Sequence, residues 1–390
     1  MNIKAKLASL AAVAIIVGTQ YPIASNADQP TLQAGDYIVV FDNQANEQAE
    51  AAKLRGQGAK VRFTYSSVFK GFAGTFNSAQ LTALQKNPRV QSIEADGVMS
   101  VDAGSPQTPT PSWGLDRIDQ RNLGLDNSYT YNTDAANVFA YVIDTGIDSK
   151  NSDFGGRVSN LGYTAIADGN GTDGCATGSA GHGTHVAGTI GGSKFGVAKN
   201  VKLVPVRVLD CNGSGTTSGV IAGINWVAAN FKSFGPLAVA NMSLGGGKSS
   251  TLNTAVNNLF ASGVTIAVAA GNNGRDACQF SPASALSAIT VGATTSTDAR
   301  ASYSNYGSCL DIFAPGSGIT SDLPGDTTGT WDGTSMATPH VTGVAALYLS
   351  LNPTKTPSDV VSAIKNSATP NKVTSAGKNS PTSLLYSLIP

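Results

Sequence analysis

Histidine, glutamate and cysteine are scarce in this sequence of 390 residues. It has three histidines, three glutamates and four cysteines. All the glutamates precede residue 100. Two of the histidines, His182 and His185, are three residues apart with no glutamate nearby, which argues against a zinc site of the HExxH type. No C-x-x-C pair is present, so a zinc site made of the four thiolates is the weaker interpretation of the cysteines.

Strong charge and long apolar runs are also missing. Charged residues make up 13% of the chain, and the formal net charge is zero. This composition argues against binding to nucleic acid through a basic patch and against an interaction tail of like charges. Beyond the N-terminal segment, no stretch is long and apolar enough for a membrane helix. We therefore expect neither nucleic acid nor membrane as a partner.

The N-terminus has the features of an export signal. Two lysines precede an apolar run over residues 7–17, and Ser25 and Ala27 follow at the spacing of a signal-peptidase site. The run is too short to span a bilayer, which takes about 20 residues. We expect a signal peptide over residues 1–27, with a disordered leader as the alternative. Export favours two disulfides among the four cysteines, with three alternative connectivities.

A change of composition near residue 100 divides the chain. Glutamate occurs only before this point, and residues 104–112, GSPQTPTPS, form a connector rich in Pro, Ser and Thr. Residues 36–101 show the patterns of a β-α-β-β-α-β unit, which is the split βαβ or ferredoxin-like arrangement. A small α+β domain is therefore expected before the connector and a larger domain after it.

In the larger part, apolar β-rich runs alternate with helical patterns. The runs cover residues 139–146, 201–210, 236–246, 264–272 and 288–295, and helical patterns occur at 218–231 and 251–263. Such alternation predicts a parallel sheet that helices cover on both faces. In such sheets, catalytic and ligand-binding residues lie at the carboxyl ends of the strands.

Two residues at strand ends and two at helix starts combine into a catalytic hypothesis. They are Asp144 at a strand end, His182 opening a helix, Asn272 at a strand end, and Ser335 opening another helix. A serine hydroxyl becomes a nucleophile when an imidazole takes its proton, and the imidazole needs a carboxylate to fix its tautomer. Asn272 and the backbone N–H of Ser335 would then donate to the oxyanion.

The residues alone leave some alternatives open. His185 is a second candidate for the base, and Asp148 is a second candidate for the acid. Pro339 falls at the end of the first turn of the helix that Ser335 opens. There a proline removes little more than the first helical hydrogen bond.

The order Asp, His, Ser is that of subtilisin, and the surrounding sequence resembles the same family. Four segments resemble the signature blocks of subtilisin-like serine proteases, namely VIDTGID (142–148), GHGTHVAGT (181–189), AAGNNG (269–274) and GTSMATPHV (333–341). Residues 113–390 are similar to the proteinase K and aqualysin branch. Residues 36–101, with VFKGFAG and VQSIEADG, resemble the inhibitor-type propeptide of this family.

The resemblance implies a fold and an activity. The fold is a three-layer, subtilisin-like α/β domain with a mainly parallel sheet, preceded by a ferredoxin-like α+β propeptide. The implied domains are a signal peptide (1–27), a propeptide (28–103) and a peptidase domain (104–390). The implied activity is that of a secreted, monomeric serine endopeptidase, made as a self-processing zymogen. It would cleave proteins with broad specificity and a preference for apolar or aromatic side chains, and its propeptide would act as an intramolecular inhibitor.

The resemblance also assigns site residues. His182 is the base, and His185 and His340 have structural roles. The implied substrate-binding residues form two backbone edges and a pocket floor. One edge is Gly213, Ser214 and Gly215, the other is Ser243, Leu244 and Gly245, and the floor is Ala269, Ala270 and Gly271. The implied disulfides are Cys175–Cys211 and Cys278–Cys309.

Structural calcium is the only cofactor that we expect. Asp116, Asp119, Gln120 and Asp126 offer several hard oxygens within eleven residues, and relatives bind calcium at similar positions. Solvated surface aspartates are the alternative. The resemblance to the proteinase K branch implies a second site, made of Asp311 and the backbone carbonyls of Leu286 and Ala288.

Two other functions fit the sequence less well. A serine esterase of the α/β-hydrolase type needs G-x-S-x-G, and GTSMA lacks the final glycine. A binding protein on an inactivated protease scaffold would be expected to have lost a triad or oxyanion residue, and none is lost.

Overall fold

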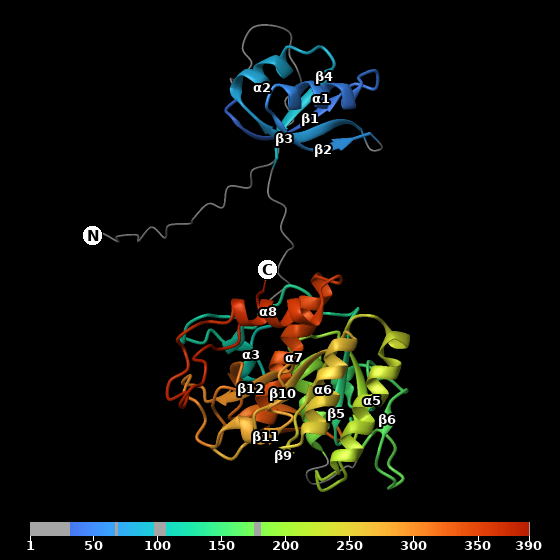
Figure 1. Cartoon of the computed structure of the whole chain (residues 1–390), viewed down its shortest axis with the longest axis vertical. Helices are drawn as coiled ribbons and strands as arrows, with labels where there is room; N and C mark the ends of the chain where they lie inside the picture. Colours follow the sequence, from blue (N-terminus) through green and yellow to red (C-terminus); the bar gives the residue numbers. More distant parts are fainter. Residues whose placement is uncertain (1–31, 67–68, 97–106, 175–180, 390) are drawn as a thin grey trace, which may run out of the picture. The chain divides into compact units, whose positions relative to one another are not determined.

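The chain divides after residue 100 into two units. The computed structural model describes residues 32–66, 69–96, 107–174 and 181–389 (Figure 1). Each unit has its own buried apolar clusters. The expected signal peptide and the expected boundary after residue 103 lie outside the described residues, so both stay predictions.

The first unit is a four-stranded antiparallel sheet with two helices. Its elements are β1 (Gly35–Phe41), α1 (Glu47–Gly56), β2 (Lys60–Tyr65), β3 (Lys70–Phe76), α2 (Ser78–Gln85) and β4 (Val90–Ala95). The strand order is β2-β3-β1-β4, and each neighbouring pair is antiparallel. Asn77 and Gln80 form a capping box that starts α2. The predicted ferredoxin-like arrangement is confirmed.

Seven parallel strands form the centre of the second unit. They are β5 (Phe139–Asp144), β6 (Tyr163–Thr164), β7 (Lys202–Arg207), β8 (Ala238–Met242), β10 (Thr265–Ala269), β12 (Ile289–Thr294) and β13 (Ile312–Pro315). Their order across the sheet is β13-β12-β10-β8-β5-β7-β6. Two antiparallel pairs accompany the sheet, β9 (Gly246–Gly247) with β11 (Phe280–Ser281), and β14 (Ile319–Leu323) with β15 (Thr327–Trp331).

Helices cover both faces of this sheet. They are α3 (Trp113–Ile118), α4 (His182–Gly191), α5 (Thr217–Phe234), α6 (Ser250–Ser262), α7 (Thr334–Leu351) and α8 (Pro357–Ser367), with the short helices η1 (Ser152–Phe154) and η3 (Ala277–Gln279). Alternate residues of β5 point to opposite faces. Ala140 and Val142 pack with residues of α4 and α7, whereas Tyr141 and Ile143 pack with residues of α5 and α6. The predicted three-layer fold is confirmed.

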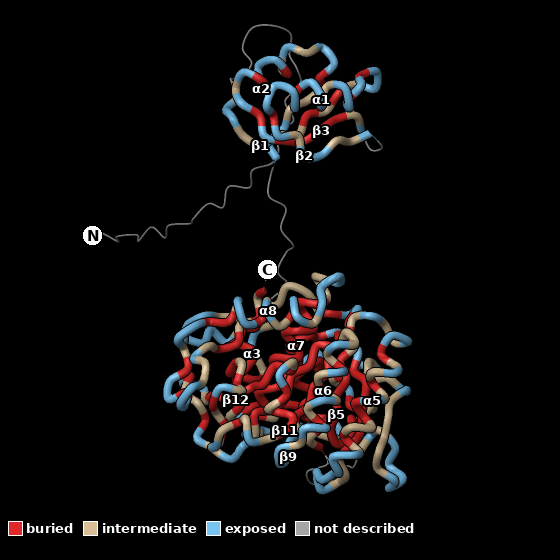
Figure 2. The backbone as a smooth tube through the Cα atoms, viewed as in Figure 1, coloured by how far each residue is buried: buried red, intermediate tan, exposed pale blue. Residues whose placement is uncertain are grey.

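Helix α7 runs through the interior of the second unit. Most of its residues from Thr334 to Leu349 are buried, and Figure 2 shows its tube in the colour of buried residues. A helix that is apolar around most of its circumference belongs in a core. Its packing therefore fixes the residues at its N-terminal tip.

The β14–β15 hairpin packs against α4. Ser321 Oγ donates to the backbone carbonyl of His185 (2.8 Å). The next residue, Asp322, is 3% exposed, and its Oδ2 has no hydrogen-bond partner. Oδ2 of Asp322 and Oδ2 of Asp153 lie 3.0 and 2.2 Å from the point that a Cβ on Gly192 would occupy. Burial, together with the nearby charge and carboxyl group of Asp153, raises the pKa of Asp322 to about 8.

We predict that Asp322 makes the fold less stable as the pH rises. An unfolded aspartate loses its proton near pH 3.9, whereas the folded chain retains it to about pH 8. The protonated form of Asp322 therefore contributes its full share to the stability of the fold below pH 4. Between pH 4 and pH 8 this contribution is lost, and the folding equilibrium constant falls by about tenfold per pH unit. The melting temperature of Asp322→Asn relative to that of the parent chain should rise from pH 4 to pH 8 and then stay constant.

Tryptophan fluorescence is a suitable readout, because all three tryptophans, Trp113, Trp226 and Trp331, lie in the second unit. Asp359→Asn is the matched control. Its carboxylate caps α8, and hydrogen bonds from Thr356 lower its pKa, so its effect should be constant above pH 4. An advantage of Asp322→Asn that stays constant from pH 4 to 8 would show that Asp322 is already ionised in the folded chain.

Candidate active site

Asp144 and His182 form the first part of the site. Asp144 ends β5 and is fully buried, and His182 is the first residue of α4. Nδ1 of His182 lies 2.8 Å from Oδ1 of Asp144. Because a carboxylate can only accept, Nδ1 carries the hydrogen and Nε2 keeps its lone pair. The structure thus places His182, and not His185, on the carboxylate.

The strand end and the helix start meet at two glycines. The N–H of Gly183 donates to Thr145 Oγ1 (2.9 Å). A Cβ on Gly183 would lie 2.2 Å from the carbonyl oxygen of Gly146, which is closer than any real side chain can approach. The glycine after His182 is therefore required by the contact that brings the imidazole to Asp144.

The charge of Asp144 controls the protonation of His182. Burial lowers the pKa of His182, but the charge of Asp144 and the hydrogen bond between the two side chains raise it more. The pKa therefore lies above the usual value of about 6.5. Such an imidazole can take a proton and stabilise it next to a fixed negative charge.

Ser335 is the second residue of α7. Its Oγ donates to the backbone carbonyl of Ser243 (3.1 Å). Ser335, His182 and Asn272 line one cavity of about 490 Å³. With Asp144 behind His182, the four predicted catalytic residues come to one place from β5, α4, α7 and the end of β10.

The amide of Asn272 has a defined orientation. Its Oδ1 accepts from the backbone N–H and from the hydroxyl of Thr334, both at 2.9 Å. Since these two donors fix the oxygen, the Nδ2 hydrogens are on the other branch of the amide, available to the cavity. The N–H of Ser335 lies in the first turn of α7, where N–H groups have no carbonyl partner within the helix.

The predicted substrate-binding residues line two further cavities. The larger, of about 740 Å³, is lined by His182 and by the two predicted edges, 213–215 and 243–245. The smaller, of about 350 Å³, is lined by Ser335 and residues 269–271, which were predicted as the pocket floor. All nine residues therefore border cavities that reach His182 or Ser335.

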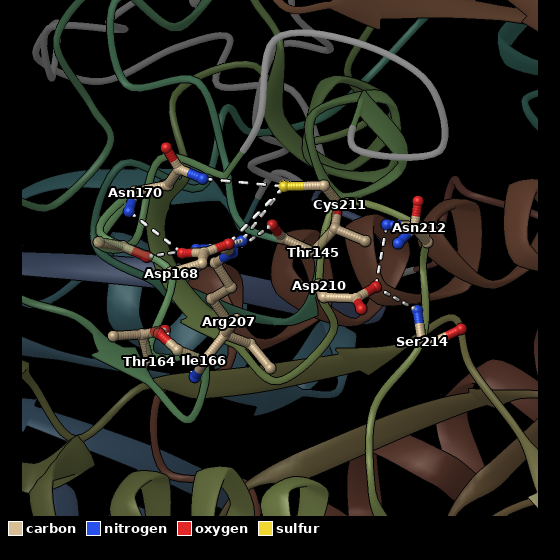
Figure 3. Close-up of polar contacts among 11 residues, drawn as sticks. Thr145, Thr164, Ile166, Asp168, Asn170, Arg207, Asp210, Cys211, Asn212 and Ser214 are labelled. Atoms are coloured by element: carbon tan, nitrogen blue, oxygen red, sulfur yellow. Dashed lines mark hydrogen bonds and ion pairs between the residues drawn. The ribbon is translucent and has the colours of Figure 1, made fainter.

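An aspartate holds the loop that carries the first edge (Figure 3). Oδ1 of Asp210 accepts from the N–H groups of Asn212 and Ser214, both at 2.9 Å. At the start of this loop, buried Arg207 donates to the carbonyl of Thr145 (3.1 Å) and pairs with Asp168 at 2.7 and 2.5 Å. Arg207 thereby ties the loop to the residue that follows Asp144.

His185 and His340 lie in structural surroundings. Both are fully buried, and burial lowers the pKa of each to about 4. Nε2 of His185 lies 3.1 Å from the carbonyl of Ile319, and Nδ1 of His340 lies 2.9 Å from that of Met336. Asp148 accepts from the N–H groups of Lys150 and Gly325, so it is engaged away from His182.

Trp331 is a site residue that the sequence analysis did not single out. Its ring is parallel to that of His185, with centroids 4.7 Å apart, and lies 6.2 Å from the ring of His182. It lines the cavities that contain His182 and Ser335. The only signal in the sequence is an aromatic residue four positions before Ser335.

The first predicted calcium site has fitting chemistry at the end of α3. The carboxylate of Asp116 accepts from the N–H groups of Asp126 and Asn127 and is contacted by the amide of Gln120. Burial and the charges of Asp116 and Asp126 raise the pKa of Asp119 to about 6. Hard oxygens and excess negative charge suit Ca²⁺. Among the described residues, however, no three His, Cys, Asp or Glu side chains are gathered around one point as metal ligands.

The second predicted calcium site does not fit as placed. Oδ1 of Asp311 pairs with Lys365 Nζ (2.8 Å), and Oδ2 accepts from the N–H of Thr290 (2.9 Å). The ammonium group takes the place of a cation on this carboxylate. We therefore propose no calcium ion at Asp311, Leu286 and Ala288.

One of the two expected disulfides lies within the described residues. Cys278 and Cys309 are joined with an S–S distance of 2.05 Å. Cys175, the expected partner of Cys211, lies outside the described residues, so that pairing stays a prediction.

A helix-tip serine that shares a cavity with an imidazole oriented by a buried carboxylate is typical of serine hydrolases. The chain belongs to the subtilase family, which it matches over residues 136–383, and residues 36–102 match the peptidase inhibitor I9 family. The predicted family and enzyme class are thus confirmed: the chain is a serine proteinase with a propeptide.

Relatives support the same assignment. The chain is 55% identical over 343 residues to an extracellular serine proteinase of Thermus sp. (strain Rt41A), with 87% of this chain and 81% of that protein covered. It is 50% identical over 351 residues to alkaline serine exoprotease A of Vibrio alginolyticus, with 86% and 64% covered. A crystal structure of a cold adapted subtilisin-like serine proteinase matches with a TM-score of 0.67 and 53% identity, over 71% of this chain and 98% of that one.

Within the part of the chain that the structure describes, no helix is long and apolar enough to cross a bilayer.

We predict that the three histidines titrate in two separate ranges. His182 should titrate above pH 6.5, and His185 and His340 near pH 4. Asp144→Asn should move His182 below pH 6.5, because the charge that favours the imidazolium is removed while burial remains. An NMR titration of the imidazole signals would measure all three, with His185 and His340 as internal controls. If no signal moves in Asp144→Asn, then His182 is not controlled by this carboxylate.

Proposed function

We propose that this chain is the zymogen of a secreted serine endopeptidase with Asp144, His182 and Ser335 as its catalytic triad. One observation carries the proposal. Nδ1 of His182 is fixed at 2.8 Å from buried Asp144, and Ser335 at the tip of α7 lines the same cavity as His182. This arrangement supplies a base of defined tautomer next to a rigidly held hydroxyl.

In the proposed reaction, Nε2 of His182 takes the proton of Ser335 Oγ as this oxygen attacks the peptide carbonyl. The Nδ2 group of Asn272 and the N–H of Ser335 donate to the oxyanion. The imidazolium then gives its proton to the leaving amine, which leaves an acyl-enzyme. Water, activated by His182, releases the second product and restores Ser335.

Substrate would bind in extended form along the two edges of the cleft. Residues 213–215 and 243–245 offer backbone groups to a peptide strand. The described residues that line the neighbouring cavity, such as Leu244, Ala270 and Phe280, include no charged side chain. This lining favours an apolar or aromatic side chain in the pocket and broad specificity elsewhere.

The first unit would act as an intramolecular inhibitor until it is cut off near Ala103. Support comes from the match to the peptidase inhibitor I9 family and from the separate core of this unit. Export would follow from the N-terminal pattern, and a relative at 55% identity is named an extracellular proteinase. We expect the mature enzyme to act as a monomer on protein substrates.

Ser335→Ala should abolish self-processing. Without the hydroxyl no acyl-enzyme forms, and hydrolysis of casein should fall by at least about 10³-fold. Full-length Ser335→Ala, expressed alone, should retain its propeptide on a denaturing gel. The control is Ser350→Ala, which removes a serine from the last turn of the same helix, where its hydroxyl bonds Asn137; this variant should process normally. Release of the propeptide by purified Ser335→Ala would rule out Ser335 as the nucleophile.

We further propose that Asp116, Asp119, Gln120 and Asp126 hold a structural calcium ion. The cation would offset the mutual repulsion of buried carboxylates near the start of the second unit. It takes no part in the proposed chemistry, because these residues are absent from the lining of all three active-site cavities.

Calcium removal should therefore lower stability and leave turnover at low temperature unchanged. A ligand at about 100 times its Kd adds about 2.7 kcal/mol to the free energy of unfolding. Thermal inactivation with and without a chelator would measure this effect. Asp119→Asn should weaken the response to calcium, whereas Asp311→Asn should not, since Asp311 pairs with Lys365. An identical response in Asp119→Asn and the parent chain would contradict the site.

A further inference from the structure

Pro339 leaves the backbone carbonyl of Ser335 without its helical partner. In an α-helix the N–H of residue 339 would donate to the carbonyl of residue 335, and proline has no N–H. The carbonyl of Ser335 accepts instead from Ser243 Oγ, at 2.9 Å. The hydrogen bond that the helix cannot make at this point thus comes from the segment that follows β8.

Ser243 is the end of a buried chain of hydrogen bonds. Its Oγ accepts from Asn241 Nδ2 (2.9 Å), and Asn241 Oδ1 accepts from Thr342 Oγ1 (2.9 Å). The exposed fractions of Thr342, Asn241 and Ser243 are 1%, 0% and 3%. Each hydroxyl has a single hydrogen. Oγ1 of Thr342 lies closer to Asn241 Oδ1 (2.9 Å) than to its other acceptor, the carbonyl of Thr338 (3.4 Å). The donors therefore run in one direction, from Thr342 through Asn241 and Ser243 to the carbonyl of Ser335.

This row of hydrogen bonds connects Ser335 to a central strand of the sheet. Asn241 lies in β8, opposite Val142 of β5 on one side and Ala267 of β10 on the other. Strand β5 ends at Asp144, and the residues that follow β10 include Asn272. Ser243 contacts Ser335 twice, because its backbone carbonyl also accepts from Ser335 Oγ (3.1 Å). The bond from Ser243 Oγ to the Ser335 carbonyl leaves the reacting hydroxyl free to turn to His182, and it is this bond that aligns the nucleophile with the strands that carry its partners.

We propose that Thr342, Asn241 and Ser243 are positioning residues, which replace the helical hydrogen bond missing at Pro339 and fix the orientation of Ser335. The inference rests on the proposed role of Ser335 as the nucleophile. Thr342 and Asn241 act through Ser243. Removing the Thr342 hydroxyl leaves Asn241 Oδ1 without this donor. The amide can then rotate, and Ser243 Oγ loses the donor that orients it.

The test compares three variants of the processed enzyme. Thr342→Val keeps the shape and removes the hydroxyl, Thr342→Ser keeps the hydroxyl, and Thr338→Val is the matched control. Thr338 is equally buried on the same helix, but its hydroxyl bonds only the carbonyl of Thr334 one turn back. Thr342→Val should lower kcat about tenfold to a hundredfold with little change in KM. Thr342→Ser should restore kcat, and Thr338→Val should match the parent enzyme.

A serine-directed sulfonyl fluoride gives a second readout that does not depend on peptide binding. Its rate of reaction with Ser335 should fall in Thr342→Val by the same factor as kcat, while the pH at which His182 titrates stays unchanged. Ser243→Ala, which keeps the backbone edge for substrate, should show the same pattern more strongly. It also serves as the test if Thr342→Val does not fold.

Two results would overturn the inference. One is equal kcat and equal sulfonyl fluoride reactivity in Thr342→Val and Thr338→Val. The other is a change confined to KM or to thermal stability. Failure of the proposed function would look different, because the parent enzyme itself would then not react with the sulfonyl fluoride at Ser335.

Discussion

The site depends on the burial of Asp144. Its carboxylate has no exposed surface, and its Oδ1 accepts from the N–H of Thr145 and contacts His182. A buried charge must be hydrogen-bonded or paired, so the imidazole has one favourable position and one tautomer. That position requires β5 and α4 to touch, and the contact requires glycine at 183, where a Cβ would clash with the carbonyl oxygen of Gly146. The motifs VIDTG and HGTH are therefore the two halves of a single contact.

Most of the fold could be predicted from the sequence, because its signals are local. Apolar runs of strand length that alternate with helical patterns admit few arrangements other than a covered parallel sheet. Such a sheet brings strand ends to one edge, which is why Asp144 and Asn272 were predicted to lie near His182 and Ser335. The residues alone did not decide between His182 and His185; the resemblance favoured His182, and the structure adds the physical reason. Their surroundings come from elsewhere in the chain, with Trp331 and the β14–β15 hairpin enclosing His185.

Other features of the site depend on pairs that are distant in sequence. Lys365 is 54 residues from Asp311, and Thr342 is 101 residues from Asn241. Spacing along the chain says nothing about such contacts, because each side chain could serve many partners. The same holds for Pro339. The sequence predicts that its cost to the helix is small, but it does not show which group takes the place of the missing N–H.

The acidic residues of the second unit are all aspartates. The short side chain of aspartate can reach backbone N–H groups in its own loop. The carboxylates of Asp148, Asp168, Asp210 and Asp276 each accept from an N–H two residues further on. This bends the backbone into a turn. In the binding mode proposed above the substrate is extended, and a segment held in that shape does not fit such a cleft. The turn at Asp210 thus shapes one edge of the cleft and at the same time offers no extended segment to the cleft of a neighbouring molecule.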